Sequence, residues 1–239
     1  PAVAQMTGWP APFGIPLIAD RRAGIMLAVA AVMLISVLVY AIGQPGAERN
    51  HGAFHPVYLV LSAGVAAAFL TGDLFNLFVA FEMMLTASYV LLTLGGGREQ
   101  IRSGMTYVVI SLVASALFLT SLALIYSATG TVNMAQLAER FGDLPNGVRL
   151  AFGLLLFVVF GIKAALFPLF SWLPDSYPTA PSPITAVFAG LLTKVGVYAI
   201  IRTQTLFLDP GTRPGTLILV VASITMLVGV LGAIAQDDI

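Results

Sequence analysis

Residues Leu74–Leu94 read LFNLFVAFEMMLTASYVLLTL, a predominantly apolar run. A helix that crosses a bilayer needs about 20 predominantly apolar residues, and the stretch is long enough. Its single charged residue is Glu82, close to the middle. A charge at the bilayer centre costs roughly 2.5–3.5 kcal/mol on insertion scales, so charges there are typical of functional sites. The stretch therefore predicts a membrane-spanning helix that carries a functional acid.

The composition of the whole chain favours the same class of protein. Hydrophobic residues make up 59% of the sequence and charged residues 9%, whereas about a quarter of the residues in a soluble domain are charged. A soluble fold would lack the polar surface needed to cover so much apolar area. The absence of cysteine excludes disulfides, iron–sulfur clusters and thiolate zinc sites within this chain. Zero net charge without a basic run gives no indication of nucleic-acid binding.

We predict an all-α, polytopic transmembrane bundle with about seven spans, forming a single domain over residues 1–239. The other apolar stretches that we expect to cross the membrane are Ala23–Gly43, His55–Thr71, Met105–Ala128, Val148–Leu166, Ile184–Arg202 and Thr216–Ala235. The chain begins without Met and stops at Asp238–Ile239 without a terminal anchor. We therefore expect an internal piece of a longer protein.

The short segment Val132–Phe141 interrupts the series of spans. It is too short and too charged to cross a bilayer. Met134, Leu137 and Phe141 recur at roughly helical spacing. The pattern predicts a helix that lies at the membrane interface.

Prolines crowd the segment that follows the fifth span. They are Pro168, Pro174, Pro178, Pro181 and Pro183. Proline lacks the backbone N–H and breaks helices, so we expect an interruption near residues 167–169, at Pro168. Unwound backbone at membrane depth is tolerated only where it is buried in protein or lines a cavity. The break therefore indicates a transport site close to it.

Charged residues are segregated along the chain. The nine arginines fall in loops or at span ends, whereas both lysines, Lys163 and Lys194, fall inside spans together with Glu82. Burial favours a neutral lysine and a nearby carboxylate favours a charged one, so such groups titrate as a coupled set. Lysine can release its proton when desolvated, whereas arginine stays charged. We therefore predict a proton relay, while a purely structural role for the three charges is the alternative.

Other polar residues are weaker candidates. Asp73 beside Gly72 fits an ordinary helix cap, with an accessory functional role as the alternative. Thr193 precedes Lys194 and could hydrogen-bond within the bundle, although threonine commonly bonds back to its own helix.

Histidines and aromatic residues at the span ends are interpreted as hydrated or as lying at the membrane–water interface. His51 and His55 are spaced i, i+4, as in a helical metal pair, but no third ligand is evident. We predict no metal site and give His55 at most an accessory role. Trp172 and Tyr177 fit the aromatic belt of a membrane protein.

Three stretches carry a family resemblance. They are GDLFNLFVAFE at Gly72–Glu82, continuing to Tyr89, GIKAALFPLFSWLPDSYPTAP at Gly161–Pro181, and FAGLLTKVGVY at Phe188–Tyr198. The chain resembles the D subunit of the multisubunit Mrp-type Na⁺/H⁺ antiporters. That family is part of the superfamily of proton-translocating membrane subunits found in respiratory complex I.

The resemblance implies a fold of fourteen helices with two inverted five-helix repeats. The spans here would be the family's third to ninth helices, and residues 55–203 the first repeat. By resemblance, Glu82 matches the glutamate of the fifth helix, Lys163 the lysine of the broken seventh helix and Lys194 the lysine of the eighth. The charged residue of the second repeat is absent, so half of the proton path would be missing.

The sequence alone leaves three functions open. The first is a proton-translocating subunit of a monovalent cation/proton antiporter in the cell membrane, without a cofactor in this chain. Its expected partners are other membrane subunits, protons, Na⁺ or another monovalent cation, and the lipid bilayer. The second is a proton-pumping subunit of a complex I-like dehydrogenase or membrane-bound hydrogenase, and the third is a structural scaffold. The segment Asp175–Tyr177 favours the antiporter, because complex I relatives usually carry a histidine there.

Overall fold

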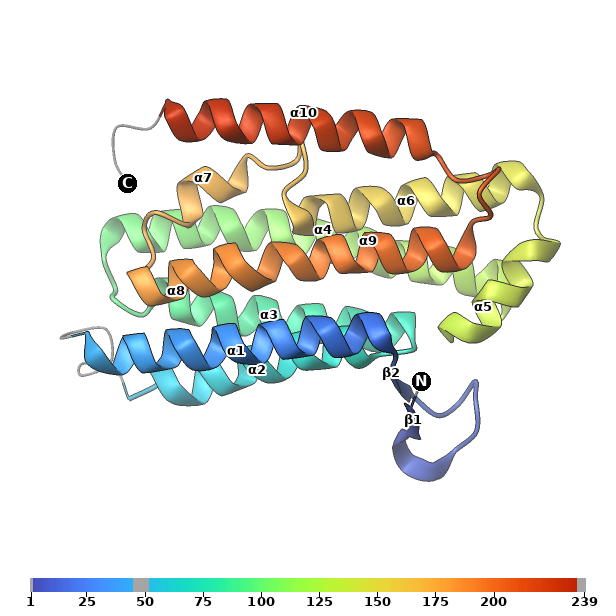
Figure 1. The fold of residues 1–239 in the computed structure, drawn as a ribbon, viewed down its shortest axis with the longest axis horizontal. Coiled ribbons are helices and arrows are strands. Elements are labelled where there is room, and N and C mark those ends of the chain that lie inside the picture. Colours follow the sequence, from blue (N-terminus) through green and yellow to red (C-terminus); the bar gives the residue numbers. More distant parts are fainter. Residues whose placement is uncertain (1, 45–51, 236–239) are drawn as a thin grey trace.

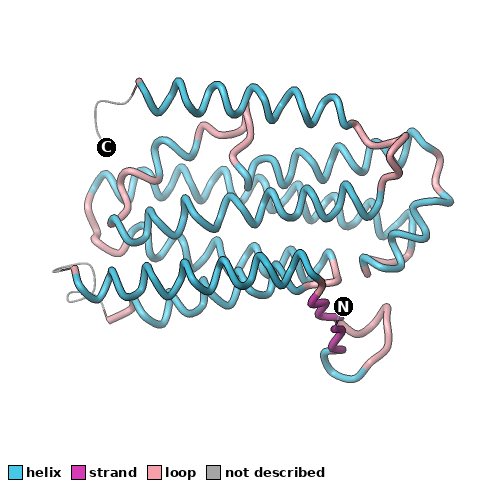
Figure 2. Tube along the Cα trace, in the orientation of Figure 1, coloured by secondary structure: helices cyan, strands magenta, loops and turns pink. Residues whose placement is uncertain are grey.

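The computed structural model describes residues 2–44 and 52–235, and it is a bundle of roughly parallel helices (Figures 1 and 2). Among these residues, 6 helical segments are long and apolar enough to cross a membrane. They are α1 (Arg21–Gly43), α3 (Leu74–Thr93), α4 (Arg98–Thr129), α6 (Asn146–Ala164), the composite segment Ser182–Phe207 and α10 (Gly215–Ile234). The predicted span His55–Thr71 forms α2 (Phe54–Leu70), a shorter apolar helix of 17 residues. The helical membrane fold is thus confirmed.

A two-stranded hairpin precedes the first long helix, and the sequence pattern did not predict it. Strand β1 (Ala2–Gln5) pairs antiparallel with β2 (Pro16–Ala19), with the short helix η1 (Met6–Gly8) between them. The amide of Gly72 donates to the carbonyl of Pro16 at 2.8 Å. This bond ties the hairpin to the connection between α2 and α3.

The predicted break after the fifth span is confirmed. Helix α6 ends at Ala164, and Ala165 adopts the left-handed region with φ of 55°. A stretch of turns leads to the short helix α7 (Trp172–Ser176). Pro168 cannot donate a backbone hydrogen bond, which explains why the helix does not resume at once.

The sixth predicted span is not a uniform α-helix. It consists of α8 (Ser182–Val187), the π-helical segment η3 (Phe188–Leu192) and α9 (Thr193–Phe207). Apolar residues of this kind suit either helix type, so the hydropathy pattern contains no signal for the π-helical segment. Such segments are rare and occur frequently at functional sites.

The prediction of an interfacial helix over Val132–Phe141 is wrong about what the apolar face of that helix contacts. A helix does form, as α5 (Met134–Arg140) followed by η2 (Phe141–Asp143). However, the side chains of Met134, Leu137 and Phe141 are buried inside the protein. Phe141 packs on Phe207 of α9, with ring centroids 5.0 Å apart. The apolar face therefore packs against α9 rather than into lipid.

Aromatic rings and one close helix contact fix the helices around the centre of the bundle. Phe81 of α3, Phe118 of α4 and Phe160 of α6 contact one another, with centroids 5.0–6.3 Å apart. On the other side of α6, Gly196 lets α9 approach the last turn closely. A Cβ atom at Gly196 would lie 2.7 Å from the amide nitrogen of Ala164.

We expect Gly196→Ala to destabilise the bundle by about 1–3 kcal/mol, because overpacking forces the backbones apart. The matched control is Gly147→Ala, since a Cβ atom at Gly147 would meet no atom within 4 Å. Thermal unfolding of the detergent-solubilised protein measures the difference. Equal melting temperatures for the two variants would contradict the close approach of α9 to α6.

Candidate functional site

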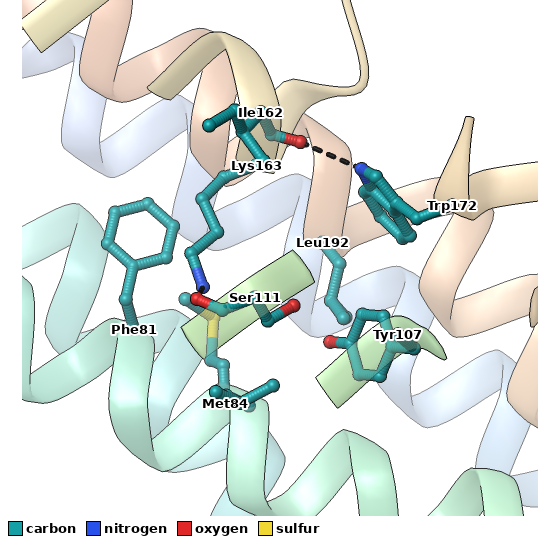
Figure 3. Close-up of a pocket in the computed structure, with 9 residues that line it drawn as sticks. Phe81, Met84, Tyr107, Ser111, Ile162, Lys163, Trp172 and Leu192 are labelled. Carbon is teal, nitrogen blue, oxygen red and sulfur yellow. Dashed lines mark hydrogen bonds between the residues drawn. The ribbon is translucent and has the colours of Figure 1, made fainter. Parts of the chain in front are cut away.

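The side chain of Lys163 lies at the centre of the helices. It extends from the last turn of α6 toward α4 (Figure 3). Its Nζ donates a long hydrogen bond of 3.5 Å to the carbonyl oxygen of Ser111 and lies 5.9 Å from the ring centroid of Phe81. Both partners stabilise a cation without neutralising it.

A small cavity of about 30 Å³ lies beside the Lys163 amino group. Its lining includes Phe81, Tyr107, Ser111, Trp172 and Leu192, which come from α3, α4, α7 and η3 (Figure 3). A cavity needs roughly 10–15 Å³ of such volume to hold one water molecule, together with polar partners. The site therefore has room for one or two water molecules next to the amine.

Glu82 lies on α3 and is half-buried. Its carboxylate accepts a hydrogen bond from the hydroxyl of Ser115. Within the described part of the chain, no ion pair joins Glu82 to Lys163. The carboxylate and the ammonium are thus held on separate partners, Ser115 and Ser111, one turn apart on α4.

The hydroxyl groups of α4 are functional candidates that the hydropathy pattern did not reveal. Tyr107, Ser111 and Ser115 recur every fourth residue, so they share one helix face. The hydroxyl of Tyr107 lies 2.7 Å from that of Ser88 on α3, within hydrogen-bond distance. Hydroxyls at i, i+4 and i+8 in an apolar helix are the signal that would have identified this polar face.

Trp172 and Tyr177 are not interfacial aromatics, and that interpretation is wrong. Both are buried. The indole Nε1 of Trp172 donates to the carbonyl of Ile162 at 3.0 Å, and the hydroxyl of Tyr177 donates to the carbonyl of Phe188 at 3.1 Å. The broken segment folds back into the bundle, which brings these rings to backbone carbonyls of α6 and η3.

Lys194 does not join the other two charges. Its side chain is exposed on the described chain, where Nζ donates to the carbonyl of Ala189 and, at 3.3 Å, to the hydroxyl of the buried Thr193. The expectation that Lys194 faces the interior of these helices is therefore wrong for the described residues. The face that it shares with Val197 and Ile201 points away from α6, because Gly196 and Ile200 occupy the packed face.

Asp73 acts as the N-cap of α3. It accepts from the amide of Asn76 at 2.9 Å and is buried. Burial raises the pKa of Asp73, against the lowering effect of hydrogen bonds from the Asn76 and Phe75 amides. The interpretation of Asp73 as a helix cap thus describes its contacts.

His55, the residue of the histidine pair that the structure describes, shows no metal-site geometry. His55 is exposed at the start of α2, with its ring 5.4 Å from that of Phe54. His51 lies outside the described residues. No group of three or more His, Cys, Asp or Glu that could hold a metal ion occurs within residues 2–44 and 52–235.

Known proteins resemble the chain along almost its full length. Residues 71–239 match the family model "NADH:quinone oxidoreductase/Mrp antiporter, TM". The D subunit of a Na⁺/H⁺ antiporter from Alkalihalophilus pseudofirmus is 51% identical over 99% of this chain and 48% of its own length. The D subunit of a Na⁺/H⁺ antiporter from Bacillus subtilis is 41% identical over 98% of the chain and 48% of its own length. The chain thus spans about half the length of the curated relatives it matches.

Solved structures share the fold as well as the sequence. A chain of the Mrp complex from Dietzia sp. superposes with a TM-score of 0.90 at 36% identity, covering 98% of this chain and 44% of that one. A chain of an archaeal membrane-bound sulfane sulfur reductase gives a TM-score of 0.90 at 32% identity, covering 99% and 49%. The chain is therefore a multi-pass integral membrane protein that belongs to the transmembrane family of NADH:quinone oxidoreductase and Mrp antiporter subunits.

Proposed function

We propose that this chain belongs to the proton path of a monovalent cation/proton antiporter complex, in which Glu82, Lys163 and Lys194 carry protons. One observation supports this most strongly. The Lys163 amine borders a cavity with room for water, and its acceptor Ser111 lies one helical turn from Ser115, which holds Glu82. The names of the two antiporter relatives point to the same activity. The chain would then be a transporter subunit rather than an enzyme.

Glu82 and Lys163 would work as a switched pair. A nearby carboxylate favours a protonated lysine, and withdrawal of the carboxylate into another hydrogen bond favours proton release. The observed bond from Ser115 to Glu82 represents the withdrawn arrangement. Rotation of Glu82 toward the cavity would favour the protonated lysine, and return to Ser115 would favour release into the water beside it.

Lys194 would pass the proton out of this part of the protein. Its exposure suits contact with a further part of the complete subunit, since the chain covers about half of its relatives. We infer that residues 55–203 form the first inverted repeat of that subunit. The expected partners are other membrane subunits, and the exchanged ion would be Na⁺ or another monovalent cation, with no cofactor in this chain.

A second function has one specific observation in its favour. The likeness to a chain of the sulfane sulfur reductase, an archaeal respiratory membrane complex, fits a proton-pumping subunit of a redox complex. The proteins that co-purify with the chain discriminate between the two functions. Small hydrophobic antiporter subunits support the first function, and peripheral subunits with iron–sulfur clusters support the second.

Lys163→Arg should abolish ΔpH-driven cation exchange in vesicles that contain the complete complex. Arginine keeps its proton and cannot release it to the cavity. Lys163→Ala and Glu82→Ala should fail as well, while the complex still assembles, which a structural scaffold role does not predict. Exchange at the wild-type rate by Lys163→Arg, at normal protein levels, would rule out proton release at this residue.

Ser115→Ala should slow exchange by about tenfold, because a hydrogen bond to a charged group is worth roughly 1.5–3 kcal/mol. The matched control is Ser127→Ala, since the Ser127 hydroxyl is exposed on α4 and donates within its own helix to Leu124. Initial rates of exchange at fixed ΔpH give the comparison. The same rate for both variants would show that Ser115 has no part in positioning Glu82.

A further inference from the structure

The backbone donors at the break between α6 and α7 need partners, because an unsatisfied N–H at membrane depth costs several kcal/mol. Three of them bond to backbone carbonyls in the last turn of α6 or in the break itself. The amide of Ala165 donates to Ile162 at 3.2 Å, that of Leu166 to Gly161 at 2.9 Å and that of Leu169 to Leu166 at 2.6 Å. Pro168 has no N–H to satisfy.

Phe167 differs from its neighbours because its amide donates outside the segment. It bonds at 3.0 Å to the hydroxyl oxygen of Thr225, near the middle of α10. Figure 1 shows the loop between α6 and α7 rising to this helix at that point. The Thr225 hydroxyl itself donates to the carbonyl of Val221 at 2.6 Å, one turn earlier in α10. This orientation leaves an oxygen lone pair free to accept from Phe167.

The contact is notable because α10 is otherwise loosely attached to the described chain. None of its residues is buried. Within the part of the chain that the structure describes, Thr225 is the side chain of α10 that hydrogen-bonds outside its own helix, whereas Ser223 donates only back to Leu219. The polar link between α10 and the bundle is therefore concentrated at the break.

We propose that Thr225 is a positioning residue that couples α10 to the proton carrier Lys163. Lys163 lies in the last turn of α6, four residues before Phe167, so the position of its amine depends on the conformation of the break. Fixing the Phe167 amide on α10 holds that last turn in place. A displacement of α10 would be passed to the break, and from there to the distance between Lys163 and Ser111. The functional consequence rests on the proposed antiporter function, whereas the hydrogen bond does not.

Hydrogen exchange at the Phe167 amide tests the link itself, in the full-length protein assembled with its partner subunits. Thr225→Val keeps the shape and removes the hydroxyl, so exchange at Phe167 should become roughly tenfold faster, in line with one lost hydrogen bond. Thr225→Ser keeps the hydroxyl and should exchange like the wild type, and so should the control Ser223→Ala. Unchanged exchange in Thr225→Val, or equally fast exchange in Thr225→Ser, would overturn the proposal.

The pH profile of cation exchange tests the coupling to Lys163. In Thr225→Val the pH of half-maximal exchange should shift by about one unit, as expected for a tenfold change in the protonation equilibrium of Lys163. Thr225→Ser should restore the wild-type profile. A lower rate with an unmoved profile would overturn the coupling and reduce Thr225 to a structural role. Failure of the wild-type complex to exchange cations at all would instead contradict the proposed function. The hydrogen-exchange test of the Phe167–Thr225 bond does not depend on that function.

Discussion

The structure depends on the accommodation of one ammonium group, that of Lys163, inside an apolar helix bundle. An isolated charge in such surroundings is costly unless polar partners or water replace its hydration. Here the compensation comes from the carbonyl of Ser111, the ring of Phe81 and a cavity of about 30 Å³. None of these partners holds the proton as firmly as a carboxylate would, and Glu82 is held on Ser115. The arrangement suits a group that must both carry a proton and release it.

The broken helix provides this environment and requires its own supports. Ending α6 at Ala164 places Lys163 in a last turn, next to the turns that replace the helix. Trp172 returns from α7 to the carbonyl of Ile162, and Thr225 of α10 accepts from the amide of Phe167. Gly196 brings α9 against the same turn. Three separate segments thus hold the few residues that set the position of the amine.

Local sequence properties predicted the spans, the break at Pro168 and the intramembrane charges Glu82 and Lys163, because hydropathy, the missing proline donor and the cost of charge in lipid are all local. The roles of Trp172 and Ser115 could not be predicted in this way, since they depend on which helices face each other. The expectation that Lys194 faces the interior was wrong for the described residues for the same reason, because the face that Lys194 occupies on α9 is set by tertiary packing.

We propose that the Lys163 amine exchanges its proton with water inside the bundle. An experimental structure of the complete complex, at a resolution that shows ordered water, would test this proton exchange. We expect at least one water molecule within hydrogen-bond distance of Lys163 Nζ, in the cavity lined by Tyr107, Ser111 and Trp172. A dry cavity, or one filled by an apolar side chain that separates Lys163 from Glu82 and Tyr107, would contradict it.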